Sequence, residues 1–243
     1  MSLRICILET DVLRPELIEQ YQGYGRMFER LFERQPIPAV FTVYNVMQGD
    51  YPADDERYDA YLVTGSKADS FGPDAWIQTL KTYLLARYEN GDKLLGVCFG
   101  HQLLALLFGG RTERASQGWG VGIHRYEVKH QPQWMSPSLQ ELTLLISHQD
   151  QVTALPEKAT LLASSPFCPI AAYCIDDQVL CFQGHPEFIH DYSRALLDIR
   201  QACIGEPSYL KAVASLESDH QGTTVAEWMM RFVAHGKQGL PAA

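Results

Sequence analysis

The chain has 243 residues, of which 46% are hydrophobic and 20% are charged, and its formal net charge is −9. A chain of this length forms one large α/β domain or two small ones, and this hydrophobic fraction is sufficient to bury a core. Lys and Arg form no cluster, which disfavours nucleic acid as a partner because phosphate binding needs concentrated positive charge. No apolar run has the length that crosses a membrane, so we expect no membrane partner.

The cysteine and histidine patterns exclude several further classes of protein. No two cysteines form a Cys-x-x-Cys pair, and most lie within apolar runs, as reduced cysteines of a core do. This pattern favours a cytoplasmic protein over a disulfide-stabilised or zinc-binding one. The N-terminal residues lead directly into a strand-like run, which predicts that there is no signal peptide. The eight histidines form no metal-binding pattern, and we predict neither a metal nor another cofactor.

Strand-like and helix-like segments alternate through the first half of the chain. Strands are predicted over residues 3–8, 39–46, 59–64 and 94–97. Helices are predicted over residues 15–34, from residue 73 to about residue 89, and after residue 98. The second of these helices directs Ile77, Leu80 and Leu84 inward. The alternation predicts an α/β fold, with a parallel sheet and helices on both of its faces.

Beyond residue 110 the chain changes to consecutive strand-like segments. They cover residues 121–128, 142–147, 159–164, 170–175 and 178–183. Turn residues such as Asp176 and Asp177 separate them, which predicts antiparallel hairpins packed on the same core. From residue 189 onward the pattern is helical again. No internal repeat and no long linker interrupts the chain, so residues 1–243 are predicted to form a single domain.

The last predicted helix opens with Thr-Val-Ala-Glu at residues 224–227, which is a capping-box pattern. Its apolar residues then fall on one face. They are Val225, Trp228, Met229 and Phe232. We therefore expect the helix to begin at this capping box and to pack its apolar face against the core.

The segment around Cys98 has the pattern of a nucleophile at a sharp turn. The apolar run at residues 94–97 suits a buried strand, and residues 103–108 are strong helix formers. Gly96 and Gly100 permit a tight strand-to-helix turn that presents the thiol above the sheet. The helix N-terminus also favours thiolate over thiol. The alternative, from this segment alone, is an inert buried cysteine beside two turn glycines.

A second apolar strand ends in His185-Pro186-Glu187. Residues two apart in extended backbone face the same side, and Pro186 keeps His185 extended. Glu187 is thus placed to accept a hydrogen bond from one imidazole nitrogen, which leaves the other nitrogen free to take the Cys98 proton. The alternative is a polar turn in which the carboxylate only satisfies the histidine. Both motifs end strands of a parallel sheet, so we expect them to meet at one edge, which favours the catalytic interpretation.

In combination, these motifs resemble those of the class I glutamine amidotransferases. The family's nucleophile motif G-x-C-x-G-x-Q corresponds to residues 96–102, and its His-Pro-Glu motif to residues 185–187. Thr-Gly-Ser at residues 64–66 is similar to the family's oxyanion loop, and residues 147–150 resemble a loop of GMP synthetase amidotransferase domains. The resemblance runs from the first strand to about Phe188. It implies a flavodoxin-like, doubly wound fold and hydrolysis of the glutamine side-chain amide through a γ-glutamyl thioester.

The resemblance and the chemistry of amide hydrolysis together predict roles for individual residues. Cys98 is the expected nucleophile, His185 is the base and then the acid, and Glu187 orients His185. The oxyanion of the reaction needs two N–H donors, and we expect them to be the backbone groups of Phe99 and Gly65. For Gly65 the alternative is an ordinary turn glycine.

Substrate-binding residues are expected at two further places. Gln102 lies one helical turn beyond the predicted nucleophile and either faces the substrate or is a solvated helix residue. The resemblance implies that Gly118, Trp119 and Gly120 bind the α-amino and α-carboxyl groups, and the alternative is a glycine-rich hairpin. We expect His148 and Asp150 to border the pocket without a catalytic role.

Three functions remain open at this point. The first is a glutaminase that passes ammonia to a separate synthetase, since no P-loop motif for ATP binding accompanies the site. The second is a stand-alone γ-glutamyl peptidase or hydrolase that uses the same triad with another leaving group. The third is a binding or regulatory protein, which the intact Cys98, His185 and Glu187 disfavour. The expected substrate is accordingly glutamine or another γ-glutamyl compound.

Overall fold

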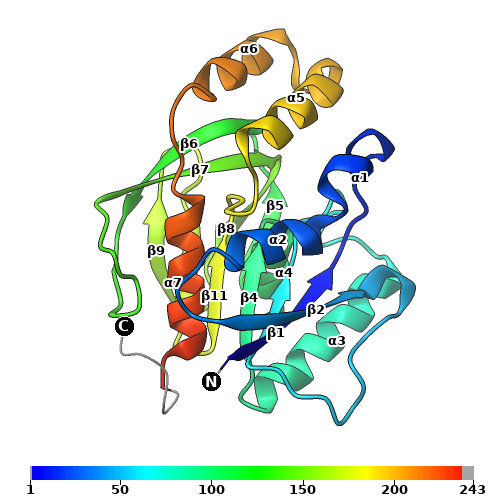
Figure 1. Cartoon of the computed structure of the whole chain (residues 1–243). Coiled ribbons are helices and arrows are strands. Elements are labelled where there is room, and N and C mark those ends of the chain that lie inside the picture. Colours follow the sequence, from blue (N-terminus) through cyan, green and yellow to red (C-terminus); the bar gives the residue numbers. More distant parts are fainter. Residues whose placement is uncertain (1, 237–243) are drawn as a thin grey trace.

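The computed structural model describes residues 2–236, and its centre is a nine-stranded sheet (Figure 1). The strand order is β2-β1-β3-β4-β11-β10-β9-β6-β7. These strands are β1 (Leu3–Glu9), β2 (Ala39–Asn45), β3 (Ala60–Val63), β4 (Lys93–Val97), β6 (Gly120–Val128), β7 (Glu141–His148), β9 (Ala159–Ser164), β10 (Ala172–Ile175) and β11 (Val179–Phe182). Strands β5 (Arg111–Arg114) and β8 (Asp150–Ala154) pair separately as a two-stranded sheet.

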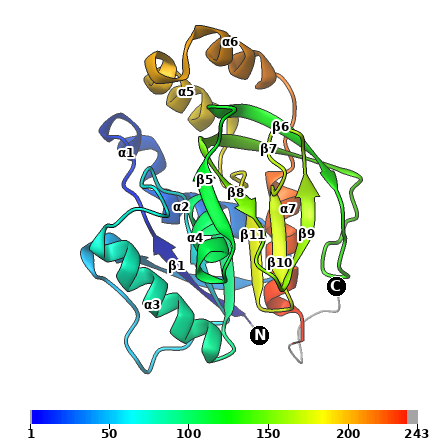
Figure 2. The same cartoon turned by 180° about the vertical axis from the view of Figure 1, so that it is seen from behind.

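Helices cover both faces of the sheet (Figures 1 and 2). Helices α2 (Tyr24–Phe32) and α7 (Gly222–Ala234) pack on one face, and α3 (Ala75–Glu89) and α4 (Phe99–Leu107) on the other. The three residues of α3 that were predicted to point inward, Ile77, Leu80 and Leu84, are buried. The remaining elements are α1 (Pro15–Tyr21), the 3-10 turn Val46–Gln48, α5 (His190–Ile204) and α6 (Glu206–Ser215).

Five neighbouring strands, β2-β1-β3-β4-β11, form the parallel half of the sheet. Strands β3 and β11 are buried at every residue because helices cover both faces there. The pairing of β11 with β4 sets Phe182 opposite Val97. The two sequence motifs therefore leave the sheet at the same edge, and the flavodoxin-like, doubly wound fold is confirmed.

Strands β10, β9, β6 and β7 continue the sheet in antiparallel pairing. Strand β10 returns as β11 through a tight turn in which Asp176 has a φ of 46°. The prediction of antiparallel hairpins packed on the same core is therefore confirmed. Helices α5 and α6 form a separate layer beside β6 (Figure 1).

The helix predicted over residues 15–34 is two helices, so the prediction of one continuous helix was wrong. The break lies at Gln22, with a φ of 70°, and Gly23, with a φ of 152°. Gln22 closes α1 by donating its N–H to the carbonyl oxygen of Ile18. The carboxylate of Glu9 then accepts the N–H of Gly25 at 2.9 Å, near the start of α2. A contact from the distant strand β1 thus supports a helix start that the apolar stripe does not reveal.

Helix α7 begins at Gly222, two residues before the predicted capping box. No side chain caps this helix, and Glu227 instead forms an ion pair with Arg231 at 2.8 Å. A side chain at Gly222 would place its Cβ 2.4 Å from the carbonyl oxygen of Pro186, so this helix start is defined by a close approach to another segment. The predicted capping box was therefore wrong, whereas the predicted apolar face is fully buried.

The strands β5 and β8 were not predicted from the sequence. Their pairing sets Arg114 opposite Asp150, and both residues line the same hollow as Cys98. Helices fill the region after residue 189, as expected, up to Ala234; residues 237–243 lie outside the described residues. Within residues 2–236, no helix is both long and apolar enough to span a membrane.

Candidate active site

Cys98 occupies the sharp turn between β4 and α4. Its φ of 54° and ψ of −100° are unusual for a residue with a side chain. A Cβ at Gly96 would lie 2.7 Å from the Gly100 backbone, and one at Gly100 would lie 2.4 Å from the carbonyl oxygen of Val63. The glycines on either side of Cys98 are therefore required by close packing, as well as by the turn itself.

His185 follows β11 and faces Glu187. Its Nδ1–H donates to Glu187 Oε1 at 2.7 Å, and both side chains are almost completely buried. The backbone N–H of His185 donates to the carbonyl oxygen of Leu145 at 2.8 Å, and its ring stacks on Phe188 at 3.8 Å between ring centroids. The convergence predicted for the two side chains is therefore present, and the ring is fixed on two sides.

Cys98 and His185 line one small hollow at the sheet edge. Burial lowers the pKa of His185, but the Glu187 carboxylate and the Cys98 sulfur raise it by more, so the net pKa is above the usual value. His185 thus holds a proton more tightly than an exposed histidine does. A buried cysteine beside a histidine that a carboxylate orients is an arrangement suited to nucleophilic attack.

Gly65 lies directly against these two side chains. A Cβ at this position would come within 2.8 Å of His185 Cε1 and 3.6 Å of Cys98 Cβ. Phe99 is the first residue of α4, and its buried ring stacks on Trp76. The backbone of both predicted oxyanion donors is thus next to the predicted nucleophile.

Thr10 and Asp11, which the sequence analysis did not select, anchor the loop that contains Gly65. Thr10 Oγ1 lies 3.2 Å from the carbonyl oxygen of Thr64 and 3.0 Å from that of Gly65. Asp11 accepts the backbone N–H of Lys67 at 2.9 Å and pairs with its ammonium group at 2.9 Å. Their position directly after β1, a strand of the parallel sheet, is the sequence signal that points to them.

Gln102 is buried and is not a solvated helix residue. Its side-chain amide donates to the carbonyl oxygen of Asp150 at 2.8 Å and to Gln183 Oε1 at 3.1 Å. It thereby connects α4 with the start of β8 and the end of β11. Gln102 also lines the wider part of the hollow beside Cys98.

The predicted glycine-rich segment contributes one side chain to that hollow, the ring of Trp119. Gly118 has a φ of 76°, and Gly120 begins β6 opposite His148. A Cβ at Gly120 would meet the ring of Phe167 at 2.6 Å, so this glycine is needed for packing. The segment thus has features of both interpretations. A strand begins here, as in a hairpin, and Trp119 faces the hollow, as a substrate-binding residue would.

The 147–150 loop forms another wall of the hollow. His148 is buried and donates from Nδ1 to the carbonyl oxygen of Asp150 at 3.0 Å, and burial lowers its pKa to about 3. Burial also raises the pKa of Asp150, although Arg114, at 2.5 Å, opposes that rise. A neutral histidine and a paired carboxylate thus border the hollow, and their polar contacts are with the Asp150 carbonyl and with Arg114.

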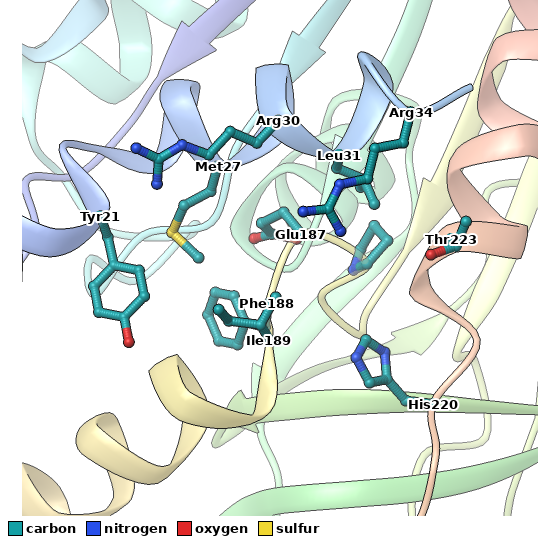
Figure 3. A pocket seen from close by; sticks show the side chains of 11 residues that line it. Tyr21, Met27, Arg30, Leu31, Arg34, Glu187, Phe188, Ile189, His220 and Thr223 are labelled. Carbon is teal, nitrogen blue, oxygen red and sulfur yellow. The ribbon is translucent and has the colours of Figure 1, made fainter. Parts of the chain in front are cut away.

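A second and separate hollow lies behind Glu187 (Figure 3). Arg30 and Leu31 of α2, together with Arg34 just after this helix, form one wall, and His220 and Thr223 form another. Cys98 is not among its lining residues. We therefore place the candidate active site in the hollow that Cys98 and His185, the predicted nucleophile and base, line together.

Comparison with known proteins assigns this chain to a protein family. The family model described as glutamine amidotransferase class-I matches residues 44–197. The chain belongs to the class I glutamine amidotransferases. Gamma-glutamyl peptidase 3 of Arabidopsis thaliana is 32% identical over 69% of this chain and 70% of its own length. The GMP synthase of Thermus thermophilus is 30% identical over 69% of this chain, but over only 32% of its own length.

A solved structure supports the amidotransferase fold over nearly the whole chain. The crystal structure of a glutamine amidotransferase from Thermotoga maritima superimposes with a TM-score of 0.77, covering 96% of this chain and 99% of that one. At 14% identity, this likeness shows the shared fold alone.

Proposed function

We propose that this chain hydrolyses the side-chain amide of glutamine to glutamate and ammonia. Family membership supports an enzyme that acts on γ-glutamyl amides. The observation that carries the proposal is that Cys98 and His185 share one hollow while His185 Nδ1 is engaged by Glu187 at 2.7 Å. The second imidazole nitrogen is then available to the thiol, as a cysteine nucleophile requires.

The reaction follows from these positions. The Cys98 sulfur attacks the amide carbonyl as its proton passes to His185, and the oxyanion is bound by the N–H groups of Phe99 and Gly65. His185 then protonates the leaving nitrogen, ammonia departs, and a γ-glutamyl thioester remains on Cys98. Water, deprotonated by His185, cleaves the thioester to give glutamate and the free thiol. Glu187 keeps the imidazole oriented and stabilises its cationic form throughout.

The substrate would lie between the two walls of the hollow. In this proposal Gln102 and the segment of Gly118, Trp119 and Gly120 bind the glutamyl portion of the substrate. Trp119 and Gln102 support it by lining the hollow with Cys98. The two glycines contribute through the backbone, where their small size permits close approach.

A γ-glutamyl peptide is the second candidate substrate, and a specific observation favours it. A relative from Arabidopsis thaliana that matches more than two thirds of this chain is named a gamma-glutamyl peptidase. The same thioester mechanism applies, with an amino acid or peptide leaving in place of ammonia. The two functions therefore differ in the leaving group and share the catalytic residues.

We further propose that free glutamine is turned over slowly unless a synthetase partner or the acceptor is present. The expected regulatory element is the loop at residues 66–72, which follows Gly65. In this structure Thr10 contacts the Gly65 carbonyl and Asp11 binds Lys67, so the slow state requires that these contacts at the base of the loop open and let Gly65 shift. Displacing an oxyanion donor lowers the rate about a hundredfold or more.

Product analysis on the purified chain tests these proposals. Glutamate release is measured with glutamine and with a panel of γ-glutamyl dipeptides, and the thiol is labelled with a glutamine-analogue electrophile. We expect Cys98→Ser to abolish hydrolysis and labelling, and Cys181→Ser, at a buried position in β11, to retain most of both. Full activity in Cys98→Ser would refute the nucleophile assignment. Fast peptide cleavage with negligible glutaminase activity would favour the peptidase.

A further inference from the structure

Three cationic side chains line the hollow beside Cys98, and they differ in how their charge is balanced. Lys67 pairs with the buried carboxylate of Asp11 at 2.9 Å. Arg114 pairs with Asp150 at 2.5 Å and with Asp69 at 3.1 Å. These two cations are therefore already matched by protein carboxylates.

The third cation, Arg200 of α5, has neutral partners. Its Nη1 donates to Ser147 Oγ at 2.6 Å, and its guanidinium lies 5.4 Å from the centre of the Trp119 ring. Among residues 2–236, no carboxylate forms an ion pair with it. Arg200 thus brings a positive charge to the hollow that the surrounding protein does not neutralise by an ion pair.

The contacts of Arg200 also fix its orientation. A hydroxyl on one side and an aromatic face on the other restrict a long side chain that would otherwise be mobile. A guanidinium has five N–H donors in a planar fork, and one contact to Ser147 leaves others to bind a ligand. Arg200 lines both parts of the hollow that contain Cys98. Such a preoriented fork is well suited to a carboxylate.

We propose that Arg200 binds a carboxylate of the substrate and so determines which γ-glutamyl compounds the site accepts. The proposal rests on the function proposed above. The carboxylate comes from one of two sources. Every γ-glutamyl compound carries the α-carboxylate of its glutamyl group, and a γ-glutamyl amino acid carries a second carboxylate on its leaving group. Arg200 acts in binding, so its loss raises KM and leaves kcat largely intact.

The test compares Arg200→Gln with Arg194→Gln, a matched change on the same helix where the arginine is exposed and pairs with Asp198. The substrates are glutamine, γ-glutamylglycine and γ-glutamylglycinamide. We expect Arg200→Gln to raise KM about tenfold or more, which is the usual effect of losing a charged hydrogen bond. Arg194→Gln should match the natural chain, and Arg200→Lys should recover part of the affinity.

The pattern across substrates identifies the carboxylate. A rise in KM with all three substrates assigns Arg200 to the α-carboxylate, and a rise with γ-glutamylglycine alone assigns it to the leaving group. An unchanged KM with every substrate, or a loss of kcat alone, would overturn the proposal.

A binding measurement separates this proposal from the proposed function. Calorimetry compares γ-glutamylglycine binding to Cys98→Ser with its binding to Cys98→Ser/Arg200→Gln, so no turnover is needed. If the natural chain hydrolyses none of the substrates, the proposed function fails, and the loss or retention of binding still decides the role of Arg200. If Arg200→Gln does not fold, Arg200→Lys answers the question, since it keeps the charge and removes the fork.

Discussion

At the scale of single residues, the pairing of His185 with Glu187 dominates the site. The two side chains are buried together, and burial lowers the pKa of the imidazole, but Glu187 and Cys98 together raise that pKa by more. Glu187 Oε1 is used by His185, and its Oε2 has no hydrogen-bond partner in the described residues. The hydrogen bond to the imidazole is therefore the main interaction of this carboxylate, as expected for a residue that orients a histidine.

Replacing Glu187 with Gln is expected to lower kcat by about two to four orders of magnitude. The amide keeps the shape of the side chain but removes the charge that stabilises the protonated imidazole and the correct tautomer. Steady-state hydrolysis measures the loss. The control is Glu227→Gln, which breaks the Glu227–Arg231 ion pair on α7 and should leave kcat unchanged. A Glu187→Gln variant with normal kcat would exclude the orienting role.

The raised pKa of His185 predicts a pH dependence of stability. A group whose pKa is raised in the folded state stabilises the protein fully below its unfolded pKa, about 6.5 for histidine. This contribution is lost as the pH rises through the folded value. Relative to Glu187→Gln, the natural chain should therefore lose free energy of unfolding as the pH rises from about 6.5 into the alkaline range. Denaturant titrations at several pH values measure the difference, and a constant difference would contradict the shift.

At the scale of elements, the site depends on how the segment after β1 supports the loop after β3. Thr10 contacts the carbonyl oxygens of Thr64 and Gly65, and the Thr64 carbonyl also accepts the N–H of Gly100 at 3.3 Å. In a trans peptide the N–H points away from the carbonyl. Fixing the Thr64 carbonyl thus fixes the direction of the Gly65 N–H, which is the proposed oxyanion donor.

Thr10→Val is expected to lower kcat about tenfold or more and to change KM little, since the oxyanion forms only during the reaction. Valine has the shape of threonine without the hydroxyl that contacts Thr64 and Gly65. Thr10→Ser retains the hydroxyl and should restore most of the rate. A purely structural role would instead lower the thermal stability of both variants without this separation of kcat from KM.

At the scale of the whole molecule, one core connects the two ends of the described chain. A single apolar cluster contains Ile5 of β1, Leu95 of β4, Leu142 of β7 and Phe232 of α7. The nine-stranded sheet likewise includes strands from the first to the last. This continuity supports the prediction of a single domain, which remains to be tested by unfolding.

The single-domain prediction requires one cooperative unfolding transition. Far-UV circular dichroism and tryptophan fluorescence should give the same midpoint in denaturant, because the shared core is lost at once. The fluorescence reports on both halves, since Trp76 lies near α4 and Trp228 lies in α7. Two separated midpoints would show that the parallel and antiparallel halves unfold as distinct domains.

The sequence by itself determined the features that depend on neighbouring residues. The alternation of strands and helices predicts the sheet, because the apolar period of each segment is local. The meeting of His185 with Glu187 follows from two-residue spacing in extended backbone. The turn at Cys98 follows from a strand, two glycines and a helix within residues 93–107. Each of these features is confirmed by the structure.

Only the tertiary structure decided the features that depend on distant segments. The break between α1 and α2 needs Glu9, and the start of α7 needs the close approach of Pro186. The anchoring of the Gly65 loop by Thr10 spans 54 residues, and the contact of Arg200 with Ser147 spans 53. Periodicity and short motifs carry no information about such pairs, because the contacts exist only once the sheet has brought their strand ends and covering helices together.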